Sequence, residues 1–504
     1  MPIIMPKDTA EALGPKAENC KSRSLFLCRF ADPAAKDAGD RQPRREWFDA
    51  LLEKAPAFPF GNSRNIWVAD SSTGPQAQLL YAQLQSRLMV NMAGGVMENA
   101  GLCLDRFGLP YIPGSAVKGC ARRTALAALR EWCETGQQPG ITAGDHDNAF
   151  KVACAPFATP ADMLAEIARI FGWSDQDWSD KRAKGRFISD FAWAGSGAST
   201  GSSAFTQDEV QQLEATGTPD PKAAAQSWPI LRDTVARKLA CDLRISIPED
   251  ESAPWKLLPN FAGSVAFLPA YPEDLGNEVL GLSIPQVPKL GKLELDVLTC
   301  HHRDYYANDA PDAVATDTEE PVPVVFPAVA SGHVFAFPLA PLRGADTRLV
   351  AQARDWLKTG LQTFGLGAKT NAGYGWFDAS EDLQKIVKEL VQSRLQKGRE
   401  RQEQLAVERQ NAREQAAREQ AEKARLAAAP PHEQAQAMYA KLDKRPFAAQ
   451  AKKYAEMNEI QRHGFVLALK QRREIAKRWA KKEPELLKPW QDYAQTLQPP
   501  IQLP

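Results

Sequence analysis

The chain has 504 residues, of which 62 are basic (Lys and Arg), 62 are acidic (Asp and Glu) and 44% are hydrophobic. A net charge of zero excludes a strongly basic protein that binds nucleic acid through bulk charge alone. No run approaches the roughly 18 apolar residues that span a bilayer, and residues 1–8 lack the apolar segment of a secretory signal, so we expect a cytoplasmic globular protein without a membrane partner.

The cysteines and the charge distribution further limit the class of protein to which the chain can belong. The eight cysteines are widely spaced and contain no Cys-x-x-Cys pair, so we expect a reducing cytoplasm and neither a disulfide framework nor a zinc site. We also expect no cofactor. Residues 380–504 hold 25 basic and 17 acidic residues, whereas residues 1–379 hold 37 basic and 45 acidic ones. The front of the chain is therefore mildly acidic and its end is basic.

Apolar periodicity predicts strands interleaved with helices up to residue 378, which is typical of an α+β fold. Ser115 is the predicted N-cap of a helix over residues 116–133. The other predicted helices cover residues 45–52, 161–171 and 349–364, and residues 207–240 read as helical with a break at 217–221. The predicted strands cover residues 24–30, 87–92, 101–105, 185–191, 261–268, 293–299, 322–327 and 333–337, and residues 195–203 read as a loop.

The composition changes after residue 378. Large apolar residues almost vanish between residues 396 and 424, and oppositely charged side chains stand four apart, which predicts a charged helical spacer over residues 380–429. Pro430 and Pro431 end it. Residues 432–495 regain aromatic residues and predict a small basic helical module. Its role stays open between docking a subunit, nucleic acid or an accessory protein and serving as a charged surface appendage.

Residues 109–123 contain the first segment that could carry chemistry. Two prolines fix the approach, Gly114 permits a turn, and Ser115 begins a helix whose first N–H groups form an anion site with Lys118 one turn inside. We hypothesise a phosphate cradle that includes Ser115, Lys118, Arg122 and Arg123. The alternative is a capped structural helix with solvated arginines.

A second segment, residues 364–375, is rich in glycine. Gly365, Gly367, Gly373 and Gly375 flank Lys369, Thr370 and Asn371, which suit phosphate and base-edge contacts, while Tyr374 offers a stacking face. The segment lacks the glycines that a P-loop needs at 363 and 368, and position 370 breaks the dinucleotide fingerprint. The alternative is a structural glycine-rich hairpin.

The third segment, residues 296–306, holds adjacent histidines. His301 and His302 lie near Asp296 and Asp304, which raises a metal site or an acid–base pair as candidates. Neighbouring residues on a strand point to opposite faces, so the two histidines seldom bind one ion. We therefore favour a structural or RNA-contacting role for His301.

Six segments together resemble the RAMP superfamily of type III CRISPR-Cas effector proteins, and the set is similar to the sixth subunits of type III-B (Cmr) complexes. They occur in the expected order between residues 86 and 378. The segments are residues 96–105, 108–122, 260–272, 296–306, 322–327 and 365–375. The chain departs from the pattern at Ala116, where a second Ser or Thr is common, in its loosely matched residues 1–85, and in everything beyond residue 380.

The resemblance implies an RRM-like (ferredoxin-like) core over residues 86–378 with a helical insertion at about 206–245, preceded by an N-terminal region and followed by an all-α extension. It implies a non-catalytic subunit that holds the 3′ region of the guide RNA and supports target RNA binding. Its partners would be guide and target RNA, other Cmr-type RAMP subunits and the small helical subunit.

The expected RNA contacts follow from the same resemblance, with Lys118 and Lys369 on one shared surface. The residues carried over are Ser115, Lys118, Arg122, Arg123, His301, Gly365, Gly367, Lys369, Thr370, Asn371, Gly373 and Tyr374. The alternative function is a metal-independent endoribonuclease in which His301 or His302 acts as general base on a 2′-hydroxyl.

Overall fold

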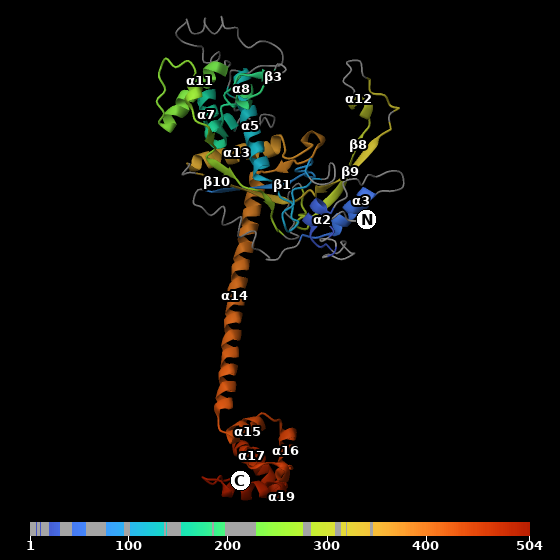
Figure 1. The fold of residues 1–504 in the computed structure, drawn as a ribbon, viewed down its shortest axis with the longest axis vertical. Helices are drawn as coiled ribbons and strands as arrows, with labels where there is room; N and C mark the ends of the chain where they lie inside the picture. Colours follow the sequence, from blue (N-terminus) through green and yellow to red (C-terminus); the bar gives the residue numbers. More distant parts are fainter. Residues whose placement is uncertain are drawn as a thin grey trace. The chain divides into compact units, whose positions relative to one another are not determined.

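The computed structural model divides the chain into two compact units, Met1–Gln396 and Lys397–Pro504 (Figure 1). The structure describes residues 20–30, 43–56, 77–94, 101–135, 138, 153–183, 186–196, 228–275, 284–307, 314–318, 320–342 and 346–504, together with Lys7 and Glu11. The predicted loop beyond residue 196 and the first part of the predicted helix at 207–240 lie outside these residues. Among the described residues, no helix is both long enough and apolar enough to cross a membrane.

A five-stranded antiparallel sheet lies at the centre of the first unit. Its strands follow the order β11 (Phe377–Asp378), β1 (Gln78–Leu84), β10 (Val334–Pro341) and β6 (Val265–Phe267), and β7 (Tyr271–Pro272) also pairs with β10. Helix α5 (Gly114–Thr135) follows β1 along the chain, and helix α13 (Thr347–Thr363) follows β10. The predicted α+β class is confirmed.

One face of this sheet packs against α5 and α13. Phe335 and Phe337 of β10 are fully buried in the cluster that the two helices complete. The helices approach closely because Gly360 has no side chain, and a Cβ there would lie 2.3 Å from the Thr124 hydroxyl. This packing joins the helix predicted at 116–133 to the one predicted at 349–364, and both helices are confirmed.

The first turns of helix α14 (Glu381–Ala428) cover the opposite face of the sheet. Leu383 and Val387 are fully buried in a cluster with Tyr81 of β1. The Gln384 side chain accepts a hydrogen bond of 3.0 Å from the Tyr81 amide and donates one to the Tyr81 carbonyl. Both faces of the sheet are therefore covered around β1.

A largely helical segment separates α5 from β6. It contains α7 (Pro160–Phe171), β2 (Gly172–Trp173), β3 (Arg182–Ala183), β4 (Arg186–Phe187), α8 (Asp190–Gly195), α11 (Trp228–Leu243), the 3-10 turn η2 (Pro254–Leu257) and β5 (Phe261–Ala262). The helix predicted at 161–171 is confirmed. The strand predicted at 185–191 is wrong beyond Phe187, because the Ser189 side chain caps α8 by accepting a hydrogen bond from the Ala192 amide.

The N-terminal region contributes helices α2 (Arg23–Arg29) and α3 (Pro43–Glu53). The helix predicted at 45–52 is confirmed, but the strand predicted at 24–30 is wrong. A short apolar run fits a buried strand and a buried helix equally well. Here the Ser22 hydroxyl caps the helix, and Phe26 stacks on Trp47 of α3 with ring centroids 3.8 Å apart.

A long hairpin of β8 (Leu293–Cys300) and β9 (Val322–Val329) extends from the main sheet and carries the short helix α12 (Arg303–Ala307) beyond β8 (Figure 1). Leu88 and Val329 exchange two backbone hydrogen bonds at its base. Side chains become exposed along it, and Tyr306 is 75% exposed. The strands predicted at 293–299 and 322–327 are confirmed, as is the one at 333–337 within β10. The one predicted at 261–268 is split between β5 and β6.

The strands predicted at 87–92 and 101–105 each form a single bridge, Leu88 with Val329 and Leu104 with Pro110. The first of these segments bonds instead to the glycine-rich residues. The Ala368 amide donates to the Met89 carbonyl and the Gly375 amide donates to the Arg87 carbonyl, each at 2.8 Å. The carbonyl groups of Arg87 and Met89 thus bond to an irregular loop instead of to a neighbouring strand.

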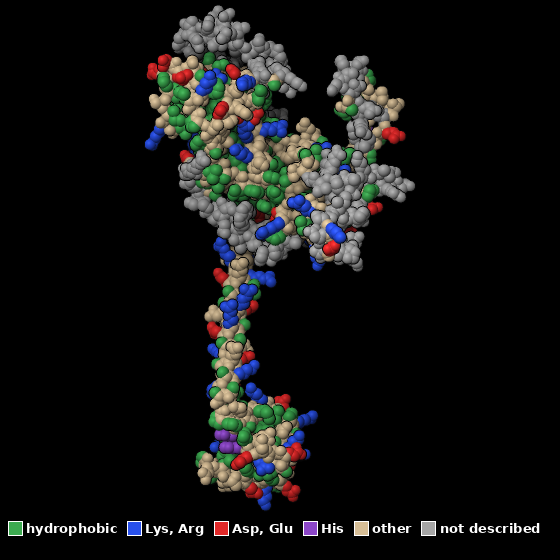
Figure 2. All heavy atoms as spheres, in the orientation of Figure 1, with side chains coloured by type: hydrophobic (Ala, Val, Ile, Leu, Met, Phe, Trp, Pro, Cys, Tyr) green, Lys and Arg blue, Asp and Glu red, His purple; other side chains and the backbone are tan. Residues whose placement is uncertain are grey.

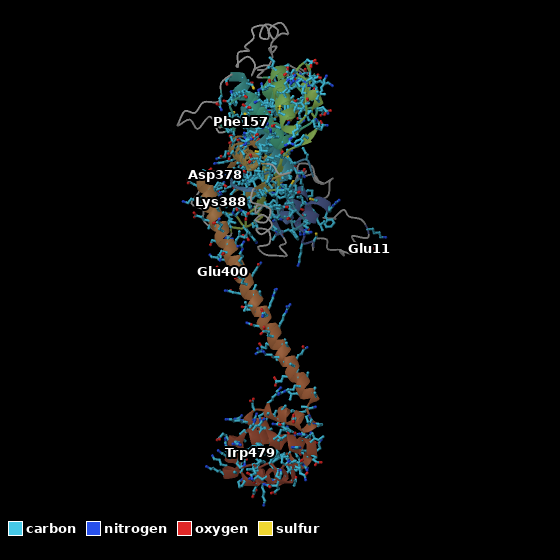
Figure 3. All side chains as sticks on the ribbon, turned by 90° about the vertical axis from the view of Figure 1, so that its left-hand side faces the viewer. Glu11, Phe157, Asp378, Lys388, Glu400 and Trp479 are labelled. Atoms are coloured by element: carbon cyan, nitrogen blue, oxygen red, sulfur yellow. The ribbon has the colours of Figure 1, made fainter. Side chains whose placement is uncertain are left out.

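The second unit begins within α14, whose residues 399–425 are all exposed. Basic and acidic side chains intersperse along this stretch (Figure 2), and side chains beyond Glu400 project from all sides of the helix (Figure 3). Five helices and one 3-10 turn follow and bury Phe447, Phe465 and Trp490. They are α15 (Pro431–Ala440), α16 (Lys444–Ala451), η4 (Tyr454–Glu456), α17 (Glu459–Gln471), α18 (Arg473–Lys482) and α19 (Pro484–Thr496).

Candidate nucleic-acid interface

Helix α5 begins at Gly114, two residues earlier than predicted. The Val117 amide donates to the Pro113 carbonyl at 3.1 Å, so Pro113 accepts the first helical hydrogen bond and Ser115 lies inside the first turn. The prediction of Ser115 as N-cap is therefore wrong. Gly114 is required at this position because a Cβ would lie 2.2 Å from the Phe267 carbonyl oxygen of β6. The Ser115 side chain is exposed.

Lys118 holds the end of a neighbouring helix. Its ammonium donates a 2.8 Å hydrogen bond to the carbonyl of Phe171, the last residue of α7. Burial, together with the charge of Arg122, lowers the pKa of Lys118 below its usual value, while Asp177 acts in the opposite sense. A cation at the C-terminus of a helix is favourable, so this contact stabilises α7 against α5.

Arg122 is also engaged within the protein. Its guanidinium forms an ion pair of 3.1 Å with Asp177 and a second with Asp190, and it lies 5.3 Å from the Phe191 ring centroid. These partners belong to α8 and to the loop between β2 and β3. Arg122 therefore joins α8 to α5.

Arg123 reaches the glycine-rich segment. Its guanidinium lies 4.4 Å from the ring centroid of Phe364, at the end of α13, while the side chain itself is exposed. On the same side of α5, the Cys120 thiol lies 3.7 Å from the Gly365 carbonyl. The two segments that the sequence analysis singled out therefore meet, although about 240 positions separate them.

Lys118 does not take part in this meeting. Residues 118 and 120 lie about 200° apart around an α-helix, so Lys118 faces α7 while Cys120 faces the glycine-rich segment. The expectation that Lys118 and Lys369 share one surface is wrong. Arg123 is the cation of α5 that lies against the second segment.

The glycine-rich segment is a tight loop with positive φ angles at all four of its glycines. Gly365, Gly367, Gly373 and Gly375 have φ of 66°, 105°, 90° and 68°, and Lys369 has φ of 59°. A Cβ at Gly375 would lie 1.9 Å from the Leu366 carbonyl oxygen, so a larger residue does not fit there. The short 3-10 turn η3 (Thr370–Ala372) forms the tip.

The tip of the loop faces solvent. Asn371, Ala372 and Gly373 are exposed, and Lys369 and Thr370 are partly exposed. In the part of the chain that the structure describes, the Lys369 ammonium forms no ion pair. A cation, a hydroxyl and an amide thus stand together on backbone that is tied to residues 87–89.

Tyr374 does not offer a stacking face. Its side chain is only 7% exposed, and its ring centroid lies 6.0 Å from that of Phe326. Its hydroxyl donates a 2.5 Å hydrogen bond to Asp296 of β8. Burial and this bond to a carboxylate raise the pKa of Tyr374. The prediction of a stacking platform is therefore wrong, and the ring anchors the loop to the hairpin.

Asp296 accepts this bond within a charge network that the sequence analysis missed. Arg87 donates to Asp296 at 2.9 Å and to Glu294 at 3.2 Å, and Lys292 pairs with Glu294 at 2.9 Å. Burial opposes ionisation, but the Tyr374 and Val297 hydrogen bonds and the Arg87 charge hold the pKa of Asp296 below its usual value. No local motif marks Arg87, because its partners lie more than 200 positions away.

The histidines lie beyond the end of β8. The His301 side chain is exposed, whereas the His302 Nδ1 is buried and has no hydrogen-bond partner among the residues that the structure describes. Asp296 is committed to Arg87 and Tyr374, so it does not form the predicted acid–base pair with these histidines. Across the described ranges, no group of three His, Cys, Asp or Glu residues could hold a metal ion.

Comparison with known proteins covers the region of the chain that contains α5 and the glycine-rich loop. The model of the RAMP superfamily matches residues 92–378. The chain is 25% identical over 302 residues to the Cmr6 subunit of the CRISPR Cmr system of Pyrococcus furiosus, which is 58% of this chain and 64% of that relative's length.

Two solved structures are also similar. The crystal structure of Cmr6 from Pyrococcus furiosus is 19% identical, covers 60% of this chain and 98% of its own, and has a TM-score of 0.25. A chain of the type III-B Cmr-β complex bound to cognate target RNA, determined by cryo-electron microscopy, is 14% identical, covers 67% and 71% of the two chains, and has a TM-score of 0.32. These TM-scores are low, so the family assignment rests on the sequence match.

Proposed function

Because the chain belongs to the RAMP superfamily, we propose that it is a non-catalytic RNA-binding subunit of a type III-B CRISPR ribonucleoprotein in the cytoplasm. It would hold the 3′ region of the guide RNA and support binding of target RNA. Other Cmr-type RAMP subunits and the small helical subunit would be its neighbours. The likeness to a Cmr6 subunit over 302 residues supports this assignment.

We further propose that the core is RRM-like (ferredoxin-like). The order β1, α5, β6, β10, α13, β11 along the chain gives the β-α-β-β-α-β succession of that architecture. The sheet order β11-β1-β10-β6 supports it, because the two helices then follow the two central strands. The hairpin of β8 and β9 would be an insertion between the second and third core strands.

The proposed RNA surface centres on the exposed tip of the glycine-rich loop. Lys369 supplies the charge that a phosphate needs, and Thr370 and Asn371 supply groups for phosphate and ribose hydroxyl contacts. Gly373 has no side chain, and among the described residues a Cβ there would meet no atom within 4 Å, so RNA can approach its backbone. The observation that carries the proposal is Lys369, which is partly exposed on a loop held by the core and forms no ion pair with any described residue.

The other residues divide by their contacts. Arg123, Ser115 and His301 are exposed, so their side chains would be available for RNA contacts. Lys118, Arg122, Gly365 and Tyr374 are engaged inside the protein, so they would act by positioning α5 and the loop. Recognition through phosphates and ribose would make binding sequence-tolerant and dependent on salt.

The test compares Lys369→Ala with Lys388→Ala, which removes the same charge from an exposed position on α14. Guide-RNA affinity of the reconstituted complex is measured at several salt concentrations. Lys369→Ala should weaken binding and reduce the slope of log affinity against log salt by about 1, while Lys388→Ala should leave both unchanged. Equal behaviour of the two variants would refute the loop as the RNA surface.

The endoribonuclease alternative is tested separately, with the purified protein. The purified full-length protein is incubated with repeat RNA without metal and the products are resolved by length. Discrete cleavage that His301→Ala abolishes would establish the alternative and overturn the non-catalytic assignment. Intact RNA in the presence of measurable binding supports the proposal.

A further inference from the structure

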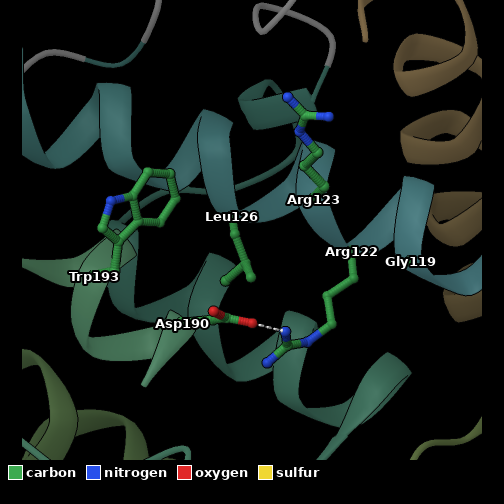
Figure 4. A pocket seen from close by; sticks show the side chains of 6 residues that line it. All are labelled: Gly119, Arg122, Arg123, Leu126, Asp190 and Trp193. Carbon is green, nitrogen blue, oxygen red and sulfur yellow. Dashed lines mark hydrogen bonds and ion pairs between the residues drawn. The ribbon is translucent and has the colours of Figure 1, made fainter. Parts of the chain in front are cut away.

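A pocket of about 320 Å³ lies between α5 and α8, outside the glycine-rich loop (Figure 4). One stripe of α5 lines it, since residues three, four and seven apart share a helix face. Asp190 and Trp193 of α8 lie opposite. The lining residues on α5 are Gly119, Arg122, Arg123 and Leu126. Its volume is at the lower end of the range for small-ligand pockets, which suits a group of nucleotide size.

Gly119 keeps this pocket open. It lies inside a 22-residue helix, where glycine is less favourable than alanine. Packing explains the glycines at 114 and 360. A Cβ at Gly114 would clash with the Phe267 carbonyl, and a Cβ at Gly360 would clash with Thr124. Among the described residues, a Cβ at Gly119 would meet no atom within 4 Å. The packing of the described residues therefore does not require this glycine, whereas a ligand that comes close to the helix would.

Trp193 presents an aromatic surface on the other wall. Its side chain is 40% exposed, although indoles bury a large area when they have a partner. The Arg130 guanidinium lies 4.4 Å from the Trp193 ring centroid, and Glu134 holds Arg130 at 2.7 Å. One contact thus orients the indole while part of it stays open to solvent.

The charges around the pocket single out Arg123. Arg122 pairs with Asp177 and Asp190, and Arg130 pairs with Glu134. For Arg123, by contrast, the structure's described part shows no ion pair, and its guanidinium lies over Phe364 at the start of the glycine-rich loop. A phosphate at Arg123 would therefore link the loop to the pocket.

We propose that this pocket binds one unstacked nucleotide of a single-stranded RNA, with its base on Trp193 and its phosphate at Arg123. The proposal rests on the RNA-binding function proposed above and extends the surface from the loop along α5. An aromatic ring and an arginine beside each other form the usual combination for single-stranded nucleic acid, because every base has a face that can stack. An aromatic side chain of a partner protein would use Trp193 but would not need Arg123.

The experiment titrates the full-length protein with fluorescein-labelled oligouridylate and follows anisotropy at several salt concentrations. Gly119→Leu fills the pocket from a position where an added Cβ meets no described atom within 4 Å. It should raise the melting temperature or leave it unchanged and weaken RNA binding at least 10-fold. Trp193→Ala should weaken binding by a similar factor, and Trp193→Phe should retain most of it.

Arg123→Ala should weaken binding and reduce the salt slope by about 1. Arg106→Ala is its matched control, since Arg106 is also exposed and lies 4.6 Å from a phenylalanine ring, that of Phe107, away from the pocket. Ile188→Ala controls for an exposed apolar residue near α8, because Ile188 is 59% exposed and does not line the pocket. Both controls should bind as the unmodified protein does.

The outcomes separate this proposal from the one it rests on. If oligouridylate binds but Gly119→Leu and Trp193→Ala bind equally well, the pocket proposal is overturned while the loop surface stands. If only Trp193→Ala reduces assembly with other subunits and RNA affinity stays unchanged, the pocket is a protein-docking site and the proposal fails. If the unmodified protein binds no RNA either alone or in the reconstituted complex, the proposed function itself fails.

Discussion

At the residue scale, several side chains that suggested chemistry turn out to hold the fold together. Lys118 bonds the end of α7, Arg122 pairs with two aspartates, and Tyr374 donates its hydroxyl to Asp296. Their residue types were informative, but each found a partner far away in the sequence. Lys369 and Arg123 lack such ion-pair partners among the described residues, which is why the RNA proposals rest on them.

His333 illustrates the same point for a titratable group. It is fully enclosed, its Nδ1 lies 2.7 Å from the Ala330 carbonyl, and its Nε2 accepts a 3.1 Å hydrogen bond from the Gly291 amide. The acceptor role of Nε2 requires the neutral ring with its proton on Nδ1. Burial lowers the pKa of His333 to about 4.

Folding stability should therefore fall with acid. A lowered pKa means that the unfolded chain binds the proton more readily, so stability is lost as pH falls from about 6.5 to about 4. The loss from His333 alone should be on the order of 3 kcal/mol. Urea unfolding of His333→Gln, which cannot titrate, should show a shallower decline over this window. Parallel curves for the two proteins would contradict this assignment.

At the element scale, α14 has two different environments along one helix. Its first turns cover the sheet face that contains Tyr81, whereas residues 399–425 are exposed. The change of composition after residue 378 indicated a new segment but not its first partner. An amphipathic stretch shows that one face is buried, and only the packed structure shows against what.

Leucines on these two parts of α14 make a matched pair. Leu383 is fully buried and Leu405 is 43% exposed. Leu383→Ala should lower the free energy of unfolding by about 2–5 kcal/mol, because it removes buried apolar contacts and leaves a cavity. Leu405→Ala should change it by less than about 0.5 kcal/mol. Chemical denaturation monitored by circular dichroism measures both, and similar losses would show that the first turns do not pack on the sheet.

At the scale of the whole molecule, the boundary between the two units falls inside α14, at Gln396, rather than where the composition changes. The distinction matters because Leu383, Val387 and Val391 belong to a cluster of the first unit. A chain that ends before α14 would expose that cluster to water, and large exposed apolar patches favour aggregation.

Two truncations test this boundary. Residues 1–396 should fold, remain soluble and keep the RNA affinity of the full chain, because the sheet stays covered and the proposed contacts lie in this unit. Residues 1–379 should melt at a markedly lower temperature or aggregate. Thermal denaturation and light scattering report both properties, and equal stability of the two truncations would contradict the role given to the start of α14.

Much of the architecture was predictable from local pattern. The helices at 116–133, 161–171 and 349–364 and the hairpin strands were correct, because a long amphipathic or alternating pattern persists whatever surrounds it. The errors fell on short apolar runs. Residues 24–30 became a helix and residues 87–92 an irregular segment, since runs this short take their conformation from what they pack against.

For the site, the amino-acid order alone located the two segments that matter and the family to which they belong. It could not show that Arg123 rather than Lys118 reaches the glycine-rich loop, that Tyr374 is buried, or that Gly119 opens onto a pocket. Those facts depend on which side of α5 faces α13 and which faces α7 and α8. Helix periodicity defines faces, but long-range packing assigns each face its neighbour.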